Sequence, residues 1–375
     1  MKFSCLQENL TEGLNISSHI ASLNKTSLPI LNNILLTAKK GELKISSTNL
    51  EMAIEVKIRA KVEKEGSITI PAQILNNYIN FLPKQVLKFE ANKNNLIISA
   101  EKQKTKIKGI SSEEFPIIPK IDSKSKYLLK SEELKNALEK TIFAISSSEV
   151  RMELSGALFS FKNKDNKKQL TIVGTDSYRL TEITIILLEK NNSKEDKDII
   201  IPLKTLQEVL KVIKGDKGNN IELYLSENQI LFIYQDIEII SRIINGKYPD
   251  YKQTIPTNIK TKALVNREEF IRIVKSASFF SKLGINDINI KFLPKKNQLI
   301  ISSVNDQIGE NEAVLDADII GDSNEIVFNY RYLIDGLNNI SNEEISLEII
   351  NDDSPGLIKS GKDKNYFYLI MPIKN

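Results

Sequence analysis

The sequence has very few of the residues on which many active sites depend, and very few that stabilise small domains through disulfides or metal ions. Its 375 residues include no tryptophan, one cysteine and one histidine. The single Cys5 cannot form an intramolecular disulfide, which fits a reducing compartment. Cys5 and His19 together cannot supply four structural zinc ligands, and they do not favour a histidine-based triad. We therefore expect no metal site and no disulfide.

Phosphate-binding loops and membrane-spanning runs are also missing from the sequence. No Gly-rich loop ending in Lys-Ser or Lys-Thr and no Gly-x-Gly-x-x-Gly turn is present. No apolar run approaches the length that crosses a bilayer, and the first residues lack the apolar core of a signal peptide. Asp176 and Asp250 lie in distinctive segments, but no second acidic residue is placed with either, so we interpret both as structural. The hypothesis is a cofactor-free cytoplasmic protein without a membrane partner.

The charge of the chain is mild. Its formal net charge is +4, which is low for a protein that grips DNA through many phosphates. Basic residues exceed acidic ones in the first third of the chain, and the reverse holds in the last third. A local basic surface is therefore favoured over a dedicated, tight DNA-binding module.

Three divergent copies of one pattern fill the chain. Each copy opens with an amphipathic helix, continues through short β-branched strands separated by Lys, Asn and Gly turns, and has a second helix. The expected opening helices are 8–22, 131–146 and 266–281, and the second helices are 71–83, 202–214 and 329–341. The expected strands are 34–38, 43–47 and 52–58; 157–161, 170–173 and 179–187; 288–292, 299–303 and 312–317; and the closing strands 96–100 and 230–234.

These repeats predict an α+β protein of three tandem two-helix, antiparallel-sheet domains, at residues 1–122, 123–255 and 256–375. Tandem units form an arc when each step carries a rotation, and two arcs with complementary ends can close a ring. Strand 104–110 alternates lysine with apolar residues, as a charged edge strand does. The alternative is one multi-helix α+β protein in which the spacing is coincidental.

Basic residues lie opposite the apolar faces of the expected helices. Such charges usually mark a solvated face, but around a hole they would give a weak, sequence-independent field for phosphates. The residues are Lys135, Lys140, Lys204, Lys211, Lys214, Arg272 and Lys275.

Distinctive short sequence motifs occur along the three repeats. They are Met-Lys-Phe at 1–3, Ser-Leu-Pro-Ile-Leu at 27–31, Thr-Asn-Leu-Glu-Met at 48–52, Ile-Pro-Ala at 70–72, Glu-Glu-Phe-Pro at 113–116, Gly-Thr-Asp-Ser-Tyr-Arg-Leu at 174–180, Asn-Gly-Lys-Tyr-Pro-Asp-Tyr at 245–251, Ser-Pro-Gly-Leu-Ile at 354–358 and Tyr-Leu-Ile-Met-Pro-Ile at 368–373. In order and spacing, over the whole chain, they resemble the bacterial DNA polymerase III β subunits, which are sliding clamps.

The resemblance implies a non-catalytic, head-to-tail homodimeric ring of six domains, with twelve helices around duplex DNA. It implies a processivity role in DNA replication, with the DNA polymerase III catalytic subunit, the clamp loader and other clamp-binding replication and repair proteins as partners. It also implies a cytoplasmic, nucleoid-associated protein without cofactor, metal or catalytic residue. Any nucleotidyltransferase activity would belong to the DNA polymerase III complex.

The resemblance also implies three sets of site residues. The pocket for peptide motifs of client proteins would comprise Leu154, Thr175, Ser177, Tyr178, Arg179, Leu180, Pro249, Thr254, Tyr332, Ile370, Met371, Pro372 and Ile373. DNA contacts would come from Lys25, Ser148, Arg151 and Lys204, while Gln73 departs from the basic residue that the family often has there. The dimer interface would include Ile107, Phe279 and Phe280, with Thr105 more polar than in some relatives.

Three competing classes remain. A nuclease or nucleotidyl transferase would need an acidic cluster. A sequence-specific DNA-binding protein would need one concentrated reading helix. A scaffold that binds peptide motifs but not DNA would differ from a clamp in one respect, because only a clamp stays on closed circular DNA and leaves when the circle is cut.

Overall fold

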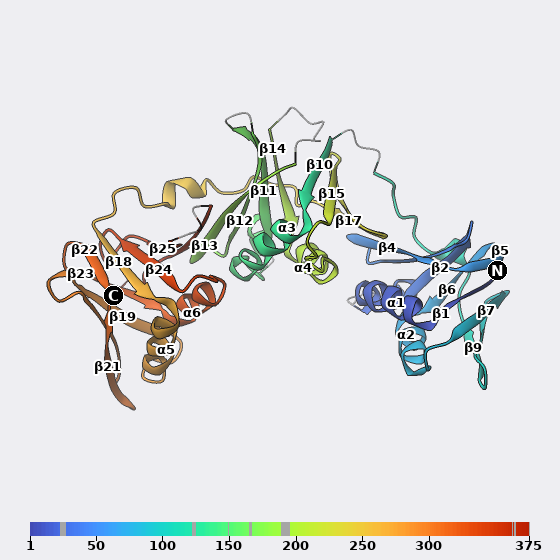
Figure 1. Ribbon diagram of the computed structural model, residues 1–375, viewed down its shortest axis with the longest axis horizontal. Coiled ribbons are helices and arrows are strands. Elements are labelled where there is room, and N and C mark those ends of the chain that lie inside the picture. Colours follow the sequence, from blue (N-terminus) through green and yellow to red (C-terminus); the bar gives the residue numbers. More distant parts are fainter. Residues whose placement is uncertain are drawn as a thin grey trace. The chain divides into compact units, whose positions relative to one another are not determined.

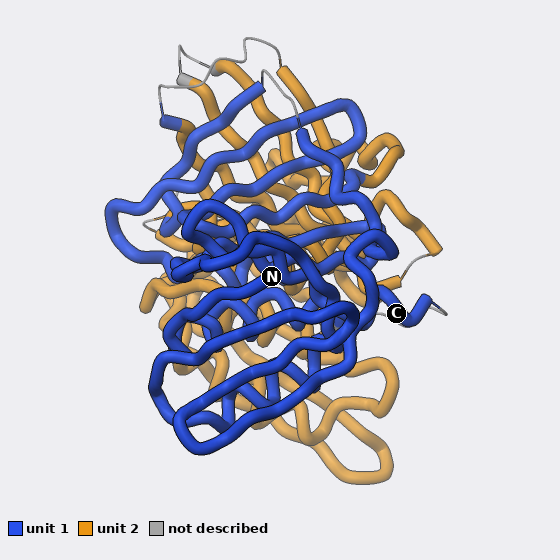
Figure 2. Tube along the Cα trace, turned by 90° about the vertical axis from the view of Figure 1, so that its right-hand side faces the viewer, with its two compact units in different colours: residues 1–132, 188–193, 208–243 blue, residues 133–187, 194–207, 244–375 orange. Residues whose placement is uncertain are grey.

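The computed structural model describes residues 1–22, 28–121, 125–148, 150–164, 167–188, 196–361, 363 and 365–374. The chain divides into two compact units, shown in two colours in Figure 2. The first unit is made of residues 1–132, 188–193 and 208–243, and the second of residues 133–187, 194–207 and 244–375. Within the described residues, every helix is too short or too polar to cross a membrane.

The first unit contains two antiparallel sheets. The smaller has the order β5-β1-β7-β8-β9, with β1 Lys2–Leu6, β5 Lys61–Lys64, β7 Val86–Asn92, β8 Asn95–Ser99 and β9 Lys104–Lys108. The larger has the order β10-β15-β16-β17-β4-β3-β2-β6, with β2 Asn33–Lys39, β3 Glu42–Thr48, β4 Met52–Arg59, β6 Gly66–Pro71, β10 Ser125–Lys130, β15 Asn220–Leu225, β16 Gln229–Tyr234 and β17 Ile237–Arg242. The short 3-10 helices η1 Pro29–Asn32 and η2 Ser112–Glu114 lie between strands.

Helices α1 (Gln7–Ser22) and α2 (Ala72–Phe81) lie side by side against these strands (Figure 1). Leu10 and Leu14 of α1 and Leu75 of α2 are buried in one core cluster with the sheets, as their helical spacing predicts. The apolar spacing of the expected helix 71–83 also predicts a buried Ile74, but this prediction was wrong, since Ile74 is 57% exposed. The core-facing stripe of α2 is formed by Ala72, Leu75 and Ile79, and Ile74 lies one residue outside it.

The second unit also contains two antiparallel sheets. The larger has the order β14-β11-β12-β13-β26-β25-β24-β18-β22, with β11 Gly156–Lys164, β12 Lys167–Thr175, β13 Arg179–Ile186, β14 Lys197–Pro202, β18 Thr261–Asn266, β22 Asp318–Gly321, β24 Glu344–Ile349, β25 Gly356–Ser360 and β26 Tyr366–Ile370. The smaller has the order β21-β20-β19-β23, with β19 Asp287–Leu293, β20 Gln298–Asn305, β21 Gly309–Asp316 and β23 Asn324–Asn329. The 3-10 helices are η3 Ile142–Ala144, η4 Met152–Leu154, η5 Tyr251–Thr254 and η6 Pro294–Lys296.

Helices α5 (Arg267–Ser278) and α6 (Tyr330–Asn338) cover the strands of the third repeat and bury Phe270, Val274, Leu333 and Leu337. Both helices begin at an asparagine N-cap whose side chain accepts a backbone N–H of the first turn. Helices α3 (Ser131–Glu139) and α4 (Leu203–Val212) contain residues of both units.

Two expectations about the second repeat need correction. The expected helix 131–146 ends at Glu139 and gives way to η3. The β-branched pair Thr141-Ile142 disfavours helix, and the Thr141 hydroxyl donates to the Ala137 carbonyl at 2.8 Å. Lys140 is not on a solvated face, because it is 8% exposed and its Nζ lies 2.7 Å from Asp363 Oδ2 and 5.0 Å from the centre of the Tyr366 ring.

The repeats are joined by strand pairing. In the first unit β4 pairs with β17, with Ile54 opposite Ile239. In the second unit β13 pairs with β26, with Leu180 opposite Leu369. Both pairs join the third long strand of one repeat to the last strand of the next. The sheets therefore continue from one repeat into the next, and the two compact units do not coincide with the three expected domain ranges, which stay a prediction.

Candidate functional site

A tight turn before β13 is held by its own side chains. Asp176 Oδ1 accepts the backbone N–H groups of Tyr178 and Arg179, both at 3.0 Å. Thr175 Oγ1 accepts the Ser177 N–H at 3.1 Å and donates to the Arg179 carbonyl at 2.6 Å. Ser177 adopts a φ of 79°, which is unfavourable for a residue with a Cβ. These contacts give Asp176 the structural role expected from the sequence. The side chains of Ser177 and Tyr178 are exposed.

The C-terminal segment runs along this turn. Beyond β26, Met371 N–H donates to the Tyr178 carbonyl at 2.8 Å, and Ile373 N–H donates to the Val327 carbonyl at 2.8 Å. Met371, Pro372 and Ile373 are half-buried, so each keeps some surface for a ligand. Ile370 is fully buried and supports the segment without offering a surface.

An apolar cluster adjoins the turn and the C-terminal segment. It buries the predicted residues Leu154 and Leu180, and the half-buried Met371 packs against it. Pro249, half-buried, and Thr254, exposed, lie in or beside the connection that holds η5. The structure thus brings Leu154, Leu180 and Met371 of the predicted pocket together.

The cluster also contains residues that were not predicted to belong to the pocket. Tyr248 and Tyr251 are buried in it, with ring centres 6.5 Å apart in an edge arrangement. The Tyr248 hydroxyl donates to the Val173 carbonyl at 3.3 Å. The Lys-Tyr-Pro-Asp-Tyr phrase marked this segment, but its tyrosines could not be assigned to the pocket without knowing that the segment crosses the sheet.

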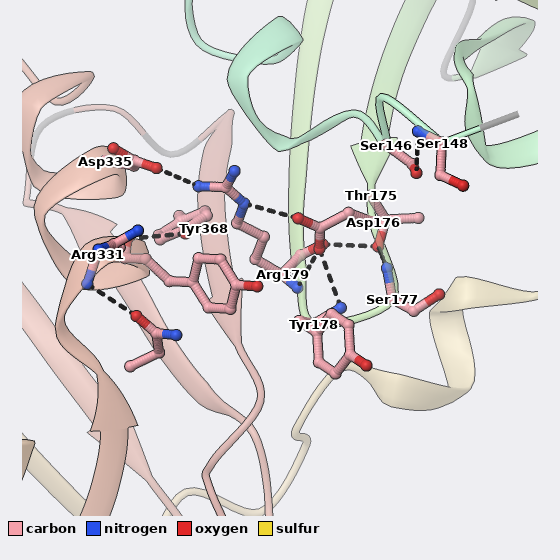
Figure 3. A network of polar contacts seen from close by, with 12 residues as sticks. Ser146, Ser148, Thr175, Asp176, Ser177, Tyr178, Arg179, Arg331, Asp335 and Tyr368 are labelled. Carbon is pink, nitrogen blue, oxygen red and sulfur yellow. Dashed lines mark hydrogen bonds and ion pairs between the residues drawn. The ribbon is translucent and has the colours of Figure 1, made fainter. Parts of the chain in front are cut away.

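Arg179 is the polar centre of the site. Its guanidinium lies between Asp176 (Nε to Oδ2, 3.0 Å) and Asp335 (Nη1 to Oδ2, 2.5 Å), as Figure 3 shows. It stacks 4.7 Å from the centre of the Tyr332 ring, and that ring lies 6.3 Å from Tyr178. Burial lowers the pKa of Arg179, but Tyr368 and the two carboxylates raise it more, so the net pKa is raised and the side chain stays charged.

Asp335 was missed by the sequence analysis, since it is 156 residues from Arg179. It lies on α6, whereas Arg179 begins β13, and only the pairing of β13 with β26 brings their two repeats into contact. A single carboxylate in an amphipathic helix carries no signal of such a distant partner.

The expected DNA-contact residues lie near one another where the structure describes them. Ser148 and Arg151 are exposed on the loop 146–155, and Lys204 is exposed in the first turn of α4. The Leu203 N–H donates to the Ser155 carbonyl at 3.0 Å, which ties the start of α4 to the end of that loop. Lys25 lies outside the described residues. Gln73 is exposed in the first turn of α2, the same helix position as Lys204.

Arg331 is a basic residue that was not among the DNA contacts expected from the sequence. It is the second residue of α6, as Lys204 is of α4 and Gln73 is of α2. The near-equal spacing of the second helices in the sequence is the signal that could have found it.

The expected interface residues differ in exposure. Phe279 is 77% exposed and Phe280 is half-buried, as expected for neighbours of which only one faces its own core. Ile107 is 6% exposed and packs in the core of the first unit. In the single chain its side chain therefore anchors strand β9 to that core. The larger exposed apolar groups around α5 and β21 also include Leu283, Ile308 and Val314, and those on α2 are Ile74 and Phe81.

Among the described residues, no group of three His, Cys, Asp or Glu side chains is placed to hold a metal ion. Asp250 is exposed and accepts a hydrogen bond from Gln253 at 2.8 Å. In the described part of the chain, the carboxylates of the site bind an arginine and backbone amides, which is structural chemistry.

Comparison with known proteins covers nearly the whole chain. Models of the N-terminal, central and C-terminal domains of the DNA polymerase III beta subunit match residues 1–119, 128–250 and 252–374. A curated beta sliding clamp from Staphylococcus epidermidis is 30% identical, with 100% of this chain and 99% of the relative covered. Among solved structures, the sliding clamp of Bacillus subtilis (27% identity, TM-score 0.93, coverage 100% and 99%) and a beta subunit from Eubacterium rectale (28%, TM-score 0.92, coverage 100% of both) have the same fold. The chain belongs to the DNA polymerase III β-subunit family of sliding clamps.

Proposed function

We propose that this chain, a sliding clamp by family, closes with a second copy into a ring. The ring encircles duplex DNA without reading its sequence and tethers the DNA polymerase III catalytic subunit. The clamp loader and other replication and repair proteins would be further partners of the same ring, in the cytoplasm at the nucleoid. We assign no catalytic step to the chain, and nucleotide transfer in the complex belongs to the polymerase.

The unused edge strands carry the proposal. Each junction between repeats pairs the third long strand of one repeat with the last strand of the next. By this rule the third repeat offers β21 and the first repeat offers β9, and both are edges of their sheets. Pairing β9 of one copy with β21 of another would satisfy both edges and close a head-to-tail pair of chains.

The charges of these two edges are complementary. Exposed Lys104, Lys106 and Lys108 alternate along β9, and exposed Glu310, Glu312 and Asp316 lie along β21. Opposite charges across an interface favour the correct partner and suppress pairing of like edges. Exposed Phe279 near one edge and Phe81 near the other would add apolar contact.

The client-binding part of the proposal rests on the surface around Met371, Tyr178 and the apolar cluster. An apolar surface with a few oriented polar groups suits capture of a short peptide motif. The proposed pocket is that set of residues, with Arg179 and Asp176 fixing its turn.

The test of encirclement uses closed circular DNA. The protein is loaded on a nicked plasmid with a clamp loader and ATP, and then separated from free protein by gel filtration. We expect retention on the circle and loss after a restriction enzyme linearises it, whereas an enzyme that only nicks again should release nothing. Equal retention on circular and linear DNA would show sequence-independent adhesion, and no retention on either would favour the scaffold that binds peptides alone.

A further inference from the structure

The loop 146–155 carries residues of both proposed binding surfaces. Ser148 and Arg151 belong to the proposed DNA contacts, and Leu154 is buried in the apolar cluster of the proposed client pocket. The loop therefore physically connects the two surfaces within one short segment.

Polar contacts hold the described part of this loop. Its apolar side chains Val150 and Met152 are 91% and 64% exposed, so they contribute little packing. Ser146 N–H donates to the Leu154 carbonyl at 3.2 Å. Arg151 Nε donates to Glu153 Oε1 at 3.0 Å, and Arg151 Nη1 donates to Ser177 Oγ at 3.2 Å.

The second of these Arg151 contacts reaches the client pocket. Ser177 is the residue with positive φ in the turn whose Tyr178 carbonyl binds Met371. A hydrogen bond from Arg151 helps to hold Ser177 in this unfavourable conformation, and so helps to preorganise the pocket before a client arrives.

A DNA phosphate would compete for the same guanidinium. Arginine forms strong, often bidentate bonds to phosphate, and the Arg151 side chain is exposed enough to turn toward one. A guanidinium that faces a phosphate with its fork cannot keep both the Glu153 and the Ser177 geometry. Glu153 favours the inward position, because its Oε1 accepts the Arg151 Nε hydrogen bond at 3.0 Å. A backbone hydrogen bond and this contact with Arg151 lower the pKa of the Glu153 carboxyl.

We propose that Arg151 couples the two surfaces: DNA and client peptide each draw its side chain to a different partner, so each weakens binding of the other. Glu153 acts as the positioning residue that holds Arg151 toward Ser177. The inference rests on the proposed function. Linkage makes the coupling reciprocal, and because the contacts are exposed, we expect a change in affinity of about two- to fivefold.

The test measures binding of a fluorescein-labelled peptide from the DNA polymerase III catalytic subunit to the full-length protein. Peptide Kd is determined by anisotropy with and without a short linear duplex, at low salt and at a duplex concentration that saturates the protein. For the natural sequence we expect the Kd to rise about two- to fivefold on DNA. For Arg151→Ala we expect the same Kd in both conditions.

Lys204→Ala is the matched control, since it also removes a proposed DNA cation but leaves the hydrogen bond from Arg151 to Ser177 in place. It should weaken the duplex, while at saturation the ratio of peptide Kd values should stay that of the natural sequence. Glu153→Gln should tighten duplex binding and reduce the ratio, because the inward position loses its carboxylate.

The outcomes separate the coupling from the proposed function. A peptide that never binds the free protein would overturn the pocket itself. A peptide that binds equally with and without duplex, or more tightly with it, would overturn the coupling and leave the pocket intact. A ratio that persists in Arg151→Ala would assign the coupling to other residues and also overturn the proposal.

Discussion

At the scale of single residues, the site combines one half-buried cation with a half-buried apolar surface. Arg179 is 13% exposed and satisfied by two carboxylates and an aromatic ring. Met371 is half-buried and adds its side chain to the apolar cluster. The two residues differ in role, because Arg179 stabilises the turn of the proposed pocket and Met371 offers apolar contact area to a ligand.

Replacing Arg179 should therefore cost stability. Arg179→Ala leaves Asp176 without its guanidinium partner and removes the stacking on Tyr332. Breaking a fully buried pair costs about 3 kcal/mol, which is the upper limit for this half-buried one. Urea denaturation followed by circular dichroism checks this. Arg331→Ala is the control, because Arg331 is exposed on the same helix as Asp335 and bonds only weakly to Tyr330. Equal stability of the two variants would contradict the role given to Arg179.

Replacing Met371 should instead cost client affinity. Met371→Ala removes apolar area worth about 1.5 kcal/mol, so the peptide Kd should rise about tenfold, while the dimer mass in sedimentation stays unchanged. Ile117→Ala, at a residue that is 94% exposed elsewhere, serves as the control. An unchanged peptide Kd for Met371→Ala would remove this residue from the pocket.

At the scale of elements, the helices and most strands followed from the sequence, because hydrophobic periodicity is local. The expected helix 266–281 and the observed Arg267–Ser278 share their buried stripe, and the expected strand 52–58 matches Met52–Arg59. The ion pair of Arg179 with Asp335 could not be predicted in this way. It depends on β13 pairing with β26 across repeats, and no local pattern encodes such a distant partner.

Helix α6 lies close to β26 because it contains a glycine. A Cβ at Gly336 would overlap the ring of Tyr368, whose hydroxyl donates to the Tyr332 carbonyl at 2.9 Å. Gly336→Ala gains about 1 kcal/mol of helix propensity but overpacks the contact at a cost of up to about 3 kcal/mol.

We therefore expect Gly336→Ala to lower the melting temperature and to weaken peptide binding through Tyr332. Differential scanning calorimetry and peptide anisotropy measure the two effects. Gly361→Ala is the control, because a Cβ at Gly361 has no neighbour within 4 Å among the described residues. A more stable Gly336→Ala would mean that the ring moves aside without strain.

The two unpaired edge strands give a second prediction at this scale. Phe279→Asp places a charge on the apolar surface beside β21 and should weaken the dimer about 30-fold or more, as loss of an interface hot spot does. Sedimentation equilibrium over a range of concentrations measures this. Ile320→Asp, at a strand residue that is 76% exposed on β22, should leave the dimer intact. A dimer that tolerates Phe279→Asp would argue against closure at this edge.

At the scale of the whole molecule, the mild charge of the chain limits how tightly it can hold DNA. The net charge is +4 in 375 residues, and the proposed contacts supply three cations per chain: Lys25, Arg151 and Lys204. A protein bound to many DNA phosphates would slide slowly along the duplex. Few and exposed contacts instead suit a ring that stays on DNA because it encloses it.

The salt dependence of DNA binding should accordingly be modest. Two chains with three cations each give a slope of log K against log salt no steeper than about −5. Duplex anisotropy titrations at several salt concentrations, with a duplex free at both ends, provide the value. A much steeper slope would reveal a dedicated DNA-binding surface that the charge distribution does not predict.

The strand pairing between repeats has a consequence for how such a protein can be divided. The β13–β26 seam is made of backbone hydrogen bonds and buried apolar side chains, so it does not depend on the covalent connection at residues 255–260. A polypeptide cut there would be expected to remain associated as two fragments. The same strand pairing can form whether its two strands belong to one polypeptide or to two. The number of subunits in a ring of this design is therefore set by how many repeats one gene encodes, and the fold itself does not fix it.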